Sequence, residues 1–90
     1  MSRIKVSVLI PAYNAGDYLE RAVDSAILQP ETEEVILVED GSPDNTLEKC
    51  KILEKKYSKV KLFQHPDGKN HGAGPTRNLA IQKATSQFIA

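Results

Sequence analysis

Three short segments of the sequence gather side chains that can recognise a ligand. Residues 11–14 (Pro-Ala-Tyr-Asn) offer the flat face of a tyrosine to a base or a sugar, and an asparagine to a hydroxyl. Residues 39–40 (Glu-Asp) place two carboxylates directly after four apolar residues. Residues 72–77 (Gly-Ala-Gly-Pro-Thr-Arg) can bring free backbone amides and a cation to an anion.

The acidic pair has two possible roles. Two carboxylates that emerge together from a buried strand cost free energy unless something compensates them. Asp40 can accept hydrogen bonds from the backbone amides of the next turn, or it can accept an N–H from the edge of a nucleobase. Glu39 should point to the opposite side of the strand and is the weaker candidate.

Arg77 is the candidate cation. We expect it in the first turn of a helix that starts at Pro75, where a positive charge is unfavourable with the helix dipole unless it has a partner. A diphosphate or the carboxylate of Asp40 would be such a partner. His65 and His71 lie six residues apart on a loop without another metal ligand, so we expect ordinary surface histidines.

The familiar phosphate-binding motifs are absent. No GxGxxG pattern follows the first apolar run, and Gly68-Lys69 is followed by Asn70 where a P-loop needs serine or threonine. Cys50 is the only cysteine, and no metal-ligand spacing occurs in the sequence. These observations exclude a disulfide framework and predict no metal site within the chain.

Composition narrows the functional class further. Twelve basic and twelve acidic residues leave no net charge, which argues against a nucleic-acid partner. The acidic excess of residues 1–45 and the basic excess of residues 46–90 predict two differently charged solvated faces. No apolar run reaches the roughly 18 residues of a membrane span and no signal-peptide core is present, so we expect a cytoplasmic protein.

The candidate residues must be positioned by alternating strands and helices. The expected order is strand 4–10 ended by Pro11, helix 19–27, strand 35–38, helix 43–57 capped by Ser42, strand 60–63, helix 75–84 and strand 87–90. This alternation predicts an α/β, Rossmann-like βαβαβαβ fold, a mostly parallel open sheet with helices on both faces. Such sheets bind ligands outside the carboxyl ends of their strands, where all three polar segments should lie.

The segments together resemble the N-terminal part of the family 2 glycosyltransferases, inverting enzymes of the GT-A fold that use nucleotide sugars. The likeness is carried by VSVLIPAYNAGDYLERAVDSAILQ (Val6 to Gln29), EEVILVEDGSPDNT (Glu33 to Thr46) and GAGPTRNLAIQKATSQFIA (Gly72 to Ala90). These segments span nearly the whole chain. No single tripeptide is specific, whereas the series at these separations is.

The resemblance implies roles for individual residues. Pro11, Ala12 and Tyr13 would pack along the nucleotide, with the aromatic ring near a uracil-type base, and we count Asn14 with them as a candidate nucleotide-binding residue. Asp40 would hydrogen-bond the base, and Arg77 would lie near the nucleotide. The implied ligand is a nucleotide-diphosphate sugar, with a UDP-sugar favoured, and the implied acceptor is a saccharide or a lipid-linked hydroxyl. The catalytic residues are unknown.

The chain also departs from the family pattern. The resemblance implies a DxD motif just after the fourth strand, which binds a divalent metal (Mg²⁺ or Mn²⁺), and a later aspartate base. The sequence stops at Phe88-Ile89-Ala90. We therefore expect residues 1–90 to be the N-terminal, nucleotide-sugar-binding half of a GT-A domain, truncated before that motif and inactive alone. Missing segments would also decide any attachment to the cytoplasmic face of a membrane.

Two other functions stay open. A non-catalytic nucleotide-binding or assembly module would use the same strand ends without chemistry. A receiver-like signalling domain has a similar fold, but Pro11 and His65 stand where such a domain needs acidic residues.

Overall fold

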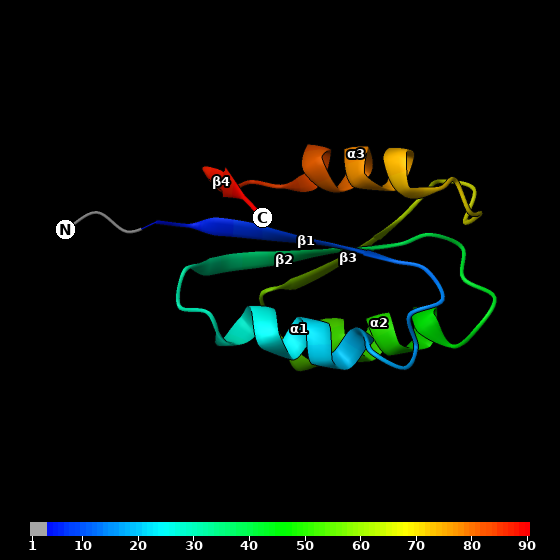
Figure 1. Ribbon diagram of the computed structural model, residues 1–90, viewed down its shortest axis with the longest axis horizontal. Coiled ribbons are helices and arrows are strands. Elements are labelled where there is room, and N and C mark those ends of the chain that lie inside the picture. The colour runs from blue at the N-terminus through cyan, green and yellow to red at the C-terminus, as the bar shows by residue number, and fades with distance from the viewer. Residues whose placement is uncertain (1–3) are drawn as a thin grey trace.

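The computed structural model describes residues 4–90. In chain order the elements are β1 (Val6–Ala12), α1 (Leu19–Leu28), β2 (Thr32–Glu39), α2 (Thr46–Lys56), β3 (Val60–Gln64), α3 (Ala73–Lys83) and β4 (Phe88–Ile89). The strands form one parallel sheet in the order β3-β2-β1-β4. Helices α1 and α2 cover one face and α3 covers the other (Figure 1). The predicted α/β fold with helices on both faces is confirmed.

The core is built around the central strand β2, which is buried on both faces. Val35 and Leu37 pack toward α1 and α2, whereas Ile36 and Val38 pack toward α3. A strand covered on both sides needs apolar residues at successive positions, which explains the uninterrupted run in the sequence. Strand β2 lies between β1 and β3 in the parallel sheet, so the carboxyl ends of β1 and β2 lie next to each other at one edge.

Pro11 does not end the first strand, contrary to the sequence-based expectation. It pairs in register with Val38, and β1 continues to Ala12. The amide of Leu9 points toward β4, where it donates to the carbonyl of Ala90. Residues two apart point the same way, so the nitrogen of Pro11 also faces the β4 side. No ladder bond toward β2 is lost there, and proline is tolerated.

Two helices begin elsewhere than predicted. Helix α2 starts at Thr46 rather than Pro43, and α3 starts at Ala73, which makes Pro75 its third residue. Proline is acceptable in a first turn because the amide it lacks has no intrahelical partner. On α3 the buried positions include Thr76 and Ala80, whereas Ile81, predicted to be buried, is 41% exposed.

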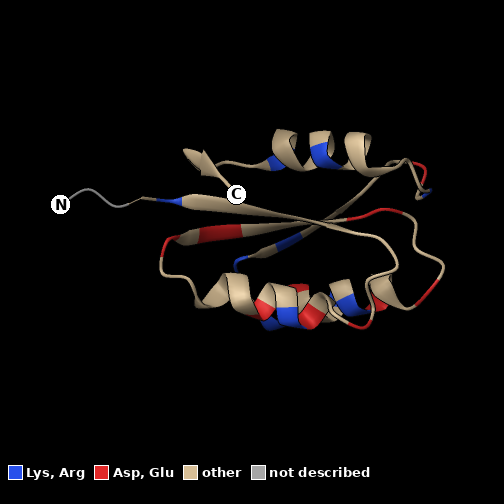
Figure 2. Cartoon of the chain, viewed as in Figure 1, with Lys and Arg blue, Asp and Glu red and all other residues tan. Residues whose placement is uncertain are grey.

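The two differently charged faces expected from the sequence are only partly present. In Figure 2, acidic and basic residues mix along α1 and α2, whereas the charged residues of α3 are all basic. No helix within residues 4–90 is long and apolar enough to cross a membrane.

Glu34, at the start of β2, is a buried carboxylate that ties four segments together. It is 2% exposed. Its Oε2 accepts hydrogen bonds from the Ser7 hydroxyl (2.6 Å) and from the amide and hydroxyl of Thr85 (2.6 and 2.9 Å). Its Oε1 accepts one from Lys61 (2.9 Å). These bonds join β1, β2 and β3 to the connection between α3 and β4.

This cluster makes stability depend on pH. Burial alone would raise the pKa of Glu34, but the hydrogen bonds outweigh it and lower the pKa from 4.5 to about 2. The stabilisation is therefore complete above pH 4.5 and is lost as the pH falls toward 2. We expect this acid-dependent loss to reach about 3 kcal/mol in the wild type and to be largely absent in Glu34→Gln. Urea denaturation at a series of pH values measures it.

The exposed neighbour Glu33 provides the matched control. Glu33→Gln should keep the acid-dependent loss of the wild type. Equal pH profiles for the wild type and Glu34→Gln would show that Glu34 does not carry the effect.

Candidate functional site

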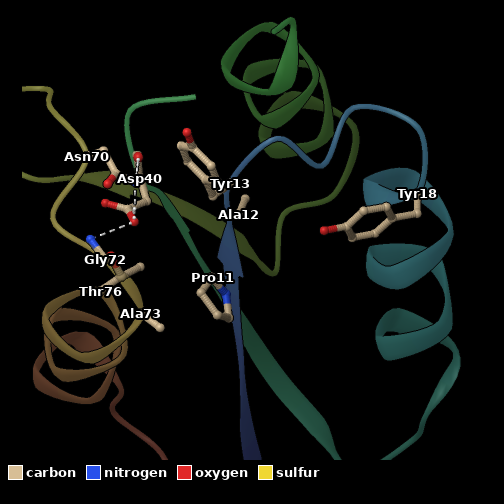
Figure 3. A pocket seen from close by; sticks show the side chains of 9 residues that line it. All are labelled: Pro11, Ala12, Tyr13, Tyr18, Asp40, Asn70, Gly72, Ala73 and Thr76. Atoms are coloured by element: carbon tan, nitrogen blue, oxygen red, sulfur yellow. Dashed lines mark hydrogen bonds between the residues drawn. The ribbon is translucent and has the colours of Figure 1, made fainter. Parts of the chain in front are cut away.

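A cavity of about 430 Å³ opens at the carboxyl ends of β1 and β2, beside the start of α3. We call it the strand-end cavity. Its lining residues are Pro11, Ala12, Tyr13, Tyr18, Asp40, Asn70, Gly72, Ala73 and Thr76 (Figure 3). The structure thus brings four of the six predicted site residues to one cavity. The other two, Asn14 and Arg77, are not among the residues that line it.

The end of β1 forms one wall of the cavity. Ala12 is fully buried, whereas the side chain of Tyr13 is 47% exposed. In Figure 3 Tyr13 and Asp40 lie on the same side of the β1 end, with the aromatic ring beside the carboxylate. The tyrosine therefore offers an open ring face next to a hydrogen-bond acceptor, as stacking on a flat ligand requires.

Asp40 also lines the cavity and is 4% exposed. Its Oδ1 accepts a hydrogen bond from the backbone amide of His71 (2.8 Å). Its Oδ2 accepts bonds from the Asn70 side-chain amide (2.9 Å) and the Gly72 backbone amide (3.1 Å). The carboxylate does bind backbone amides, but those of the loop after β3 rather than those of the next turn.

The next turn is held by Glu39 instead. Its two oxygens accept the backbone amides of Gly41 (3.0 Å) and Ser42 (2.6 Å). Glu39 lies on the other side of the strand end, as the alternation of side chains predicts. The hydrogen bonds that offset the burial of the two carboxylates therefore come from two loops, the one after β2 for Glu39 and the one after β3 for Asp40.

Asp40 keeps the capacity to accept another hydrogen bond. An ionised carboxylate has about four acceptor positions. Donors from residues 70–72 occupy three of them. Nε2 of His65 lies 3.4 Å from Oδ1, farther away than each of these three donors. A ligand N–H that enters the cavity can therefore bind this carboxylate.

His65 was expected at the surface, and that prediction is wrong. It is 8% exposed, and its Nε2 lies 2.9 Å from Oγ1 of Thr76, a cavity residue. Its ring stacks on His71 at a centroid distance of 4.2 Å. The signal in the sequence was its position directly after β3, equivalent to that of Asp40 after β2. His71 is the exposed member of the pair and contacts Asp67 (2.8 Å).

Gly41 allows the loop after β3 to approach Asp40. It has φ +65°, and a Cβ atom there would lie 2.4 Å from the amide nitrogen of Asn70. Asn70 also donates to the Asp40 carbonyl oxygen (2.9 Å). The two loops thus touch through backbone atoms at a position where only glycine fits.

Arg77 and Asn14 lie next to cavity residues. Because α3 begins at Ala73, Arg77 falls beyond the first turn, where it is exposed beside Thr76. Asn14 follows Tyr13 with φ +50°, and its backbone amide donates to the Ser42 hydroxyl (2.9 Å). Their predicted roles in ligand binding stay predictions.

The described residues offer no metal-binding set. Among residues 4–90, no three histidine, cysteine, aspartate or glutamate side chains lie close enough together to hold a metal ion. Asp40 faces backbone amides and an amide side chain, which are donors and not fellow metal ligands. These residues therefore do not fit the divalent metal that the sequence resemblance implies for a whole enzyme.

The comparisons with known proteins agree with this geometry. The family model described as Glycosyl transferase family 2 matches residues 7–90. An uncharacterized glycosyltransferase of Escherichia coli K12, YibD, is 40% identical over 87 residues, which is 96% of this chain and 24% of that protein. Chondroitin synthase of Pasteurella multocida is 39% identical over 85 residues, 93% of this chain and 8% of that protein. The chain thus spans a quarter or less of either relative.

Solved structures share the fold. A fragment of S. aureus TarS superposes with a TM-score of 0.79 at 32% identity, covering 96% of this chain and 26% of that one. The same protein was also solved in complex with UDP-GlcNAc. A mannosyltransferase of Pyrobaculum calidifontis, in complex with GDP-Man and Mn²⁺, gives a TM-score of 0.84 at 22% identity, over 99% of this chain and 27% of that one. The likeness supports the predicted GT-A architecture.

We expect Gly41→Ala to open the contact between the loops. The substitution places a methyl group against the backbone of the loop and strains a left-handed φ, so the free energy of unfolding should fall by about 2 kcal/mol or more. Amide hydrogen exchange at residues 71 and 72 should accelerate as their bonds to Asp40 break. Urea denaturation and exchange measured by NMR test both effects.

Gly68→Ala is the matched control because Gly68 has φ +69° but open space around it. Its free energy of unfolding should fall by about 1 kcal/mol, the conformational cost of placing alanine at a left-handed φ. Equal losses in the two variants would mean that the close approach at Gly41 contributes nothing.

Proposed function

Since this chain belongs to glycosyl transferase family 2, we propose that it supplies the nucleotide-binding part of an enzyme that transfers a sugar from a nucleotide-diphosphate sugar to an acceptor hydroxyl. The observation that carries the proposal is the strand-end cavity, in which the open ring of Tyr13 lies beside the partly saturated carboxylate of Asp40. A nucleobase presents the two matching features, a flat face and an N–H edge.

A uridine nucleotide is the favoured ligand. Uracil has one ring N–H, which matches the single acceptor position that residues 70–72 leave on Asp40. TarS, 32% identical to this chain, was solved with UDP-GlcNAc, which supports the same choice. A base with its N–H on the carboxylate and its face on Tyr13 directs the rest of the nucleotide outward from the cavity.

The start of α3 suits the diphosphate. Gly72 and Ala73 line the cavity, and although the Gly72 amide is bound to Asp40, the amides of Ala73 and Gly74 at the start of the helix have no intrahelical partner. These amides and the helix dipole favour an anion. Arg77, one turn further along α3 and exposed, adds a positive charge that can reach a phosphate from the same side.

The proposed reaction of the whole enzyme is a single displacement that inverts the anomeric carbon. A carboxylate base takes the proton of the acceptor hydroxyl as that oxygen attacks, and the nucleoside diphosphate leaves. Residues 4–90 contribute by holding the nucleotide in place, which fixes the anomeric carbon for attack. The base, the metal ligands and the site for a saccharide or lipid-linked acceptor belong to the rest of the enzyme.

We expect Asp40→Ala to weaken the binding of UDP by about 1 to 3 kcal/mol, the usual cost of losing a hydrogen bond to a charged group. Isothermal titration calorimetry with UDP measures the change. Asn70→Ala is the control: it loosens the same loop but keeps the carboxylate, so it should cost much less. Unchanged affinity in Asp40→Ala would remove Asp40 from the binding site.

Arg77 can be tested by comparing ligands with and without phosphates. Arg77→Gln should lower the affinity for UDP at least threefold, since it removes a charge near the proposed diphosphate, and should leave the affinity for uridine unchanged. Lys83→Gln, at the far end of the same helix, is the control. A loss of affinity for uridine equal to that for UDP would place Arg77 elsewhere than at the phosphates.

A further inference from the structure

Side chains from the loop after β2 and from the first residue of α2 bind three successive backbone amides of the loop after β1. The bonds run from Asn14 to the Ser42 hydroxyl (2.9 Å), from Ala15 to the Thr46 hydroxyl (2.8 Å) and from Gly16 to Asp44 Oδ2 (3.2 Å). We call Ser42, Asp44 and Thr46 the amide clamp. None of the three lines the strand-end cavity.

The clamp is itself held in one arrangement. The other oxygen of Asp44 accepts both the backbone amide and the hydroxyl of Thr46. The Thr46 hydroxyl therefore donates to Asp44, which leaves its lone pairs for the amide of Ala15. Thr46 is fully buried and Ala15 is 1% exposed, so water does not compete for this bond. Lys49 completes the contact by donating to the carbonyl of Gly16.

The clamped loop has a backbone that needs this support. Asn14 has φ +50°, a conformation that costs free energy for a residue other than glycine. A Cβ atom on Gly16 would lie 2.2 Å from the side-chain oxygen of Asn45 and 3.0 Å from that of Asp44. The two loops are therefore packed backbone to side chain without space between them.

The clamp also decides which chemistry this loop can perform. Successive free amides after the first strand of an α/β sheet can bind phosphate. Here all three amides of residues 14–16 already have partners, so the loop cannot serve as a phosphate cradle. The ring of Tyr13 lines the cavity, directly precedes the clamped amides and is 47% exposed, so it stays available to a ligand.

We propose that Ser42, Asp44 and Thr46 are positioning residues that hold the Tyr13 ring at the strand-end cavity in the orientation that stacks on the nucleobase. Asp44 is the central member because it binds both Gly16 and Thr46. The inference rests on the proposed function, since it assigns the clamp a role in nucleotide binding through Tyr13.

A double-mutant cycle with UDP in calorimetry tests this role. We expect Asp44→Ala to lower the affinity five- to tenfold in the wild-type background and less than twofold in the Tyr13→Ala background, because the ring through which it acts is then absent. Thr46→Val should repeat the pattern with less disturbance of the start of α2. Glu48→Ala, which removes an exposed carboxylate in the first turn of α2, is the control and should leave the affinity unchanged.

A measurement without ligand separates this inference from the proposed function. With 3-fluorotyrosine incorporated and the Tyr13 signal assigned by Tyr13→Phe, Asp44→Ala should shift or broaden that ¹⁹F resonance, while Glu48→Ala should not. If the signal moves but the wild type does not bind UDP, the proposed function fails and the positioning role stands. An unmoved signal, or equal losses of affinity in both backgrounds of the cycle, would overturn the positioning role.

Discussion

The arrangement of the site depends on the burial of the Asp40 carboxylate. A charged group removed from water costs several kcal/mol unless hydrogen-bond donors replace its hydration. The three donors all come from residues 70–72, so the loop after β3 has to close against the end of β2. Gly72, the last of these donors, is also the residue that precedes α3. One carboxylate therefore sets both the wall of the cavity and the start of the helix beside it.

The adjacent carboxylate organises the other side of the sheet. Glu39 holds the amide of Ser42, and Ser42 in turn binds the amide of Asn14. The two acids thus bring together three loops that are far apart in sequence. Burial, followed by the charges of Glu39 and Asp44, raises the pKa of the Cys50 thiol to about 12. The only cysteine is therefore a neutral packing residue beneath these loops and not a nucleophile.

Much of the fold is predictable because its strongest signals are local. The apolar run at residues 35–38 identifies β2 whatever surrounds it, and the alternation of elements gives the parallel sheet. The start of α2 was not predictable in this way. Ser42 is a good helix cap by residue type, but its hydroxyl accepts the amide of a residue 28 positions earlier. No local pattern shows whether the hydroxyl of Ser42 will cap the next helix or accept a distant amide, and here it accepts the amide of Asn14.

In the site too, the features set by the order of the elements are predictable, whereas those set by contacts between distant residues are not. Pro11, Ala12, Tyr13 and Asp40 meet because parallel strands end at one edge of the sheet, which the order of elements already implies. His65 was missed because a histidine after a strand is buried only if a later residue, here Thr76, packs over it. That contact depends on where α3 begins, and α3 begins at Ala73, two residues before the proline that was expected to start it.

Strand β2 carries a buried carboxylate near each end, and the difference between them separates a structural group from a binding group. Glu34 receives four donors from β1, β3 and the connection before β4, and it does not line the strand-end cavity. Asp40 receives three and lines that cavity. Burial and hydrogen bonding are common to both residues, so neither property identifies a site. What distinguishes Asp40 is its place in the lining of a cavity that a ligand can enter, together with the exposed aromatic ring of Tyr13.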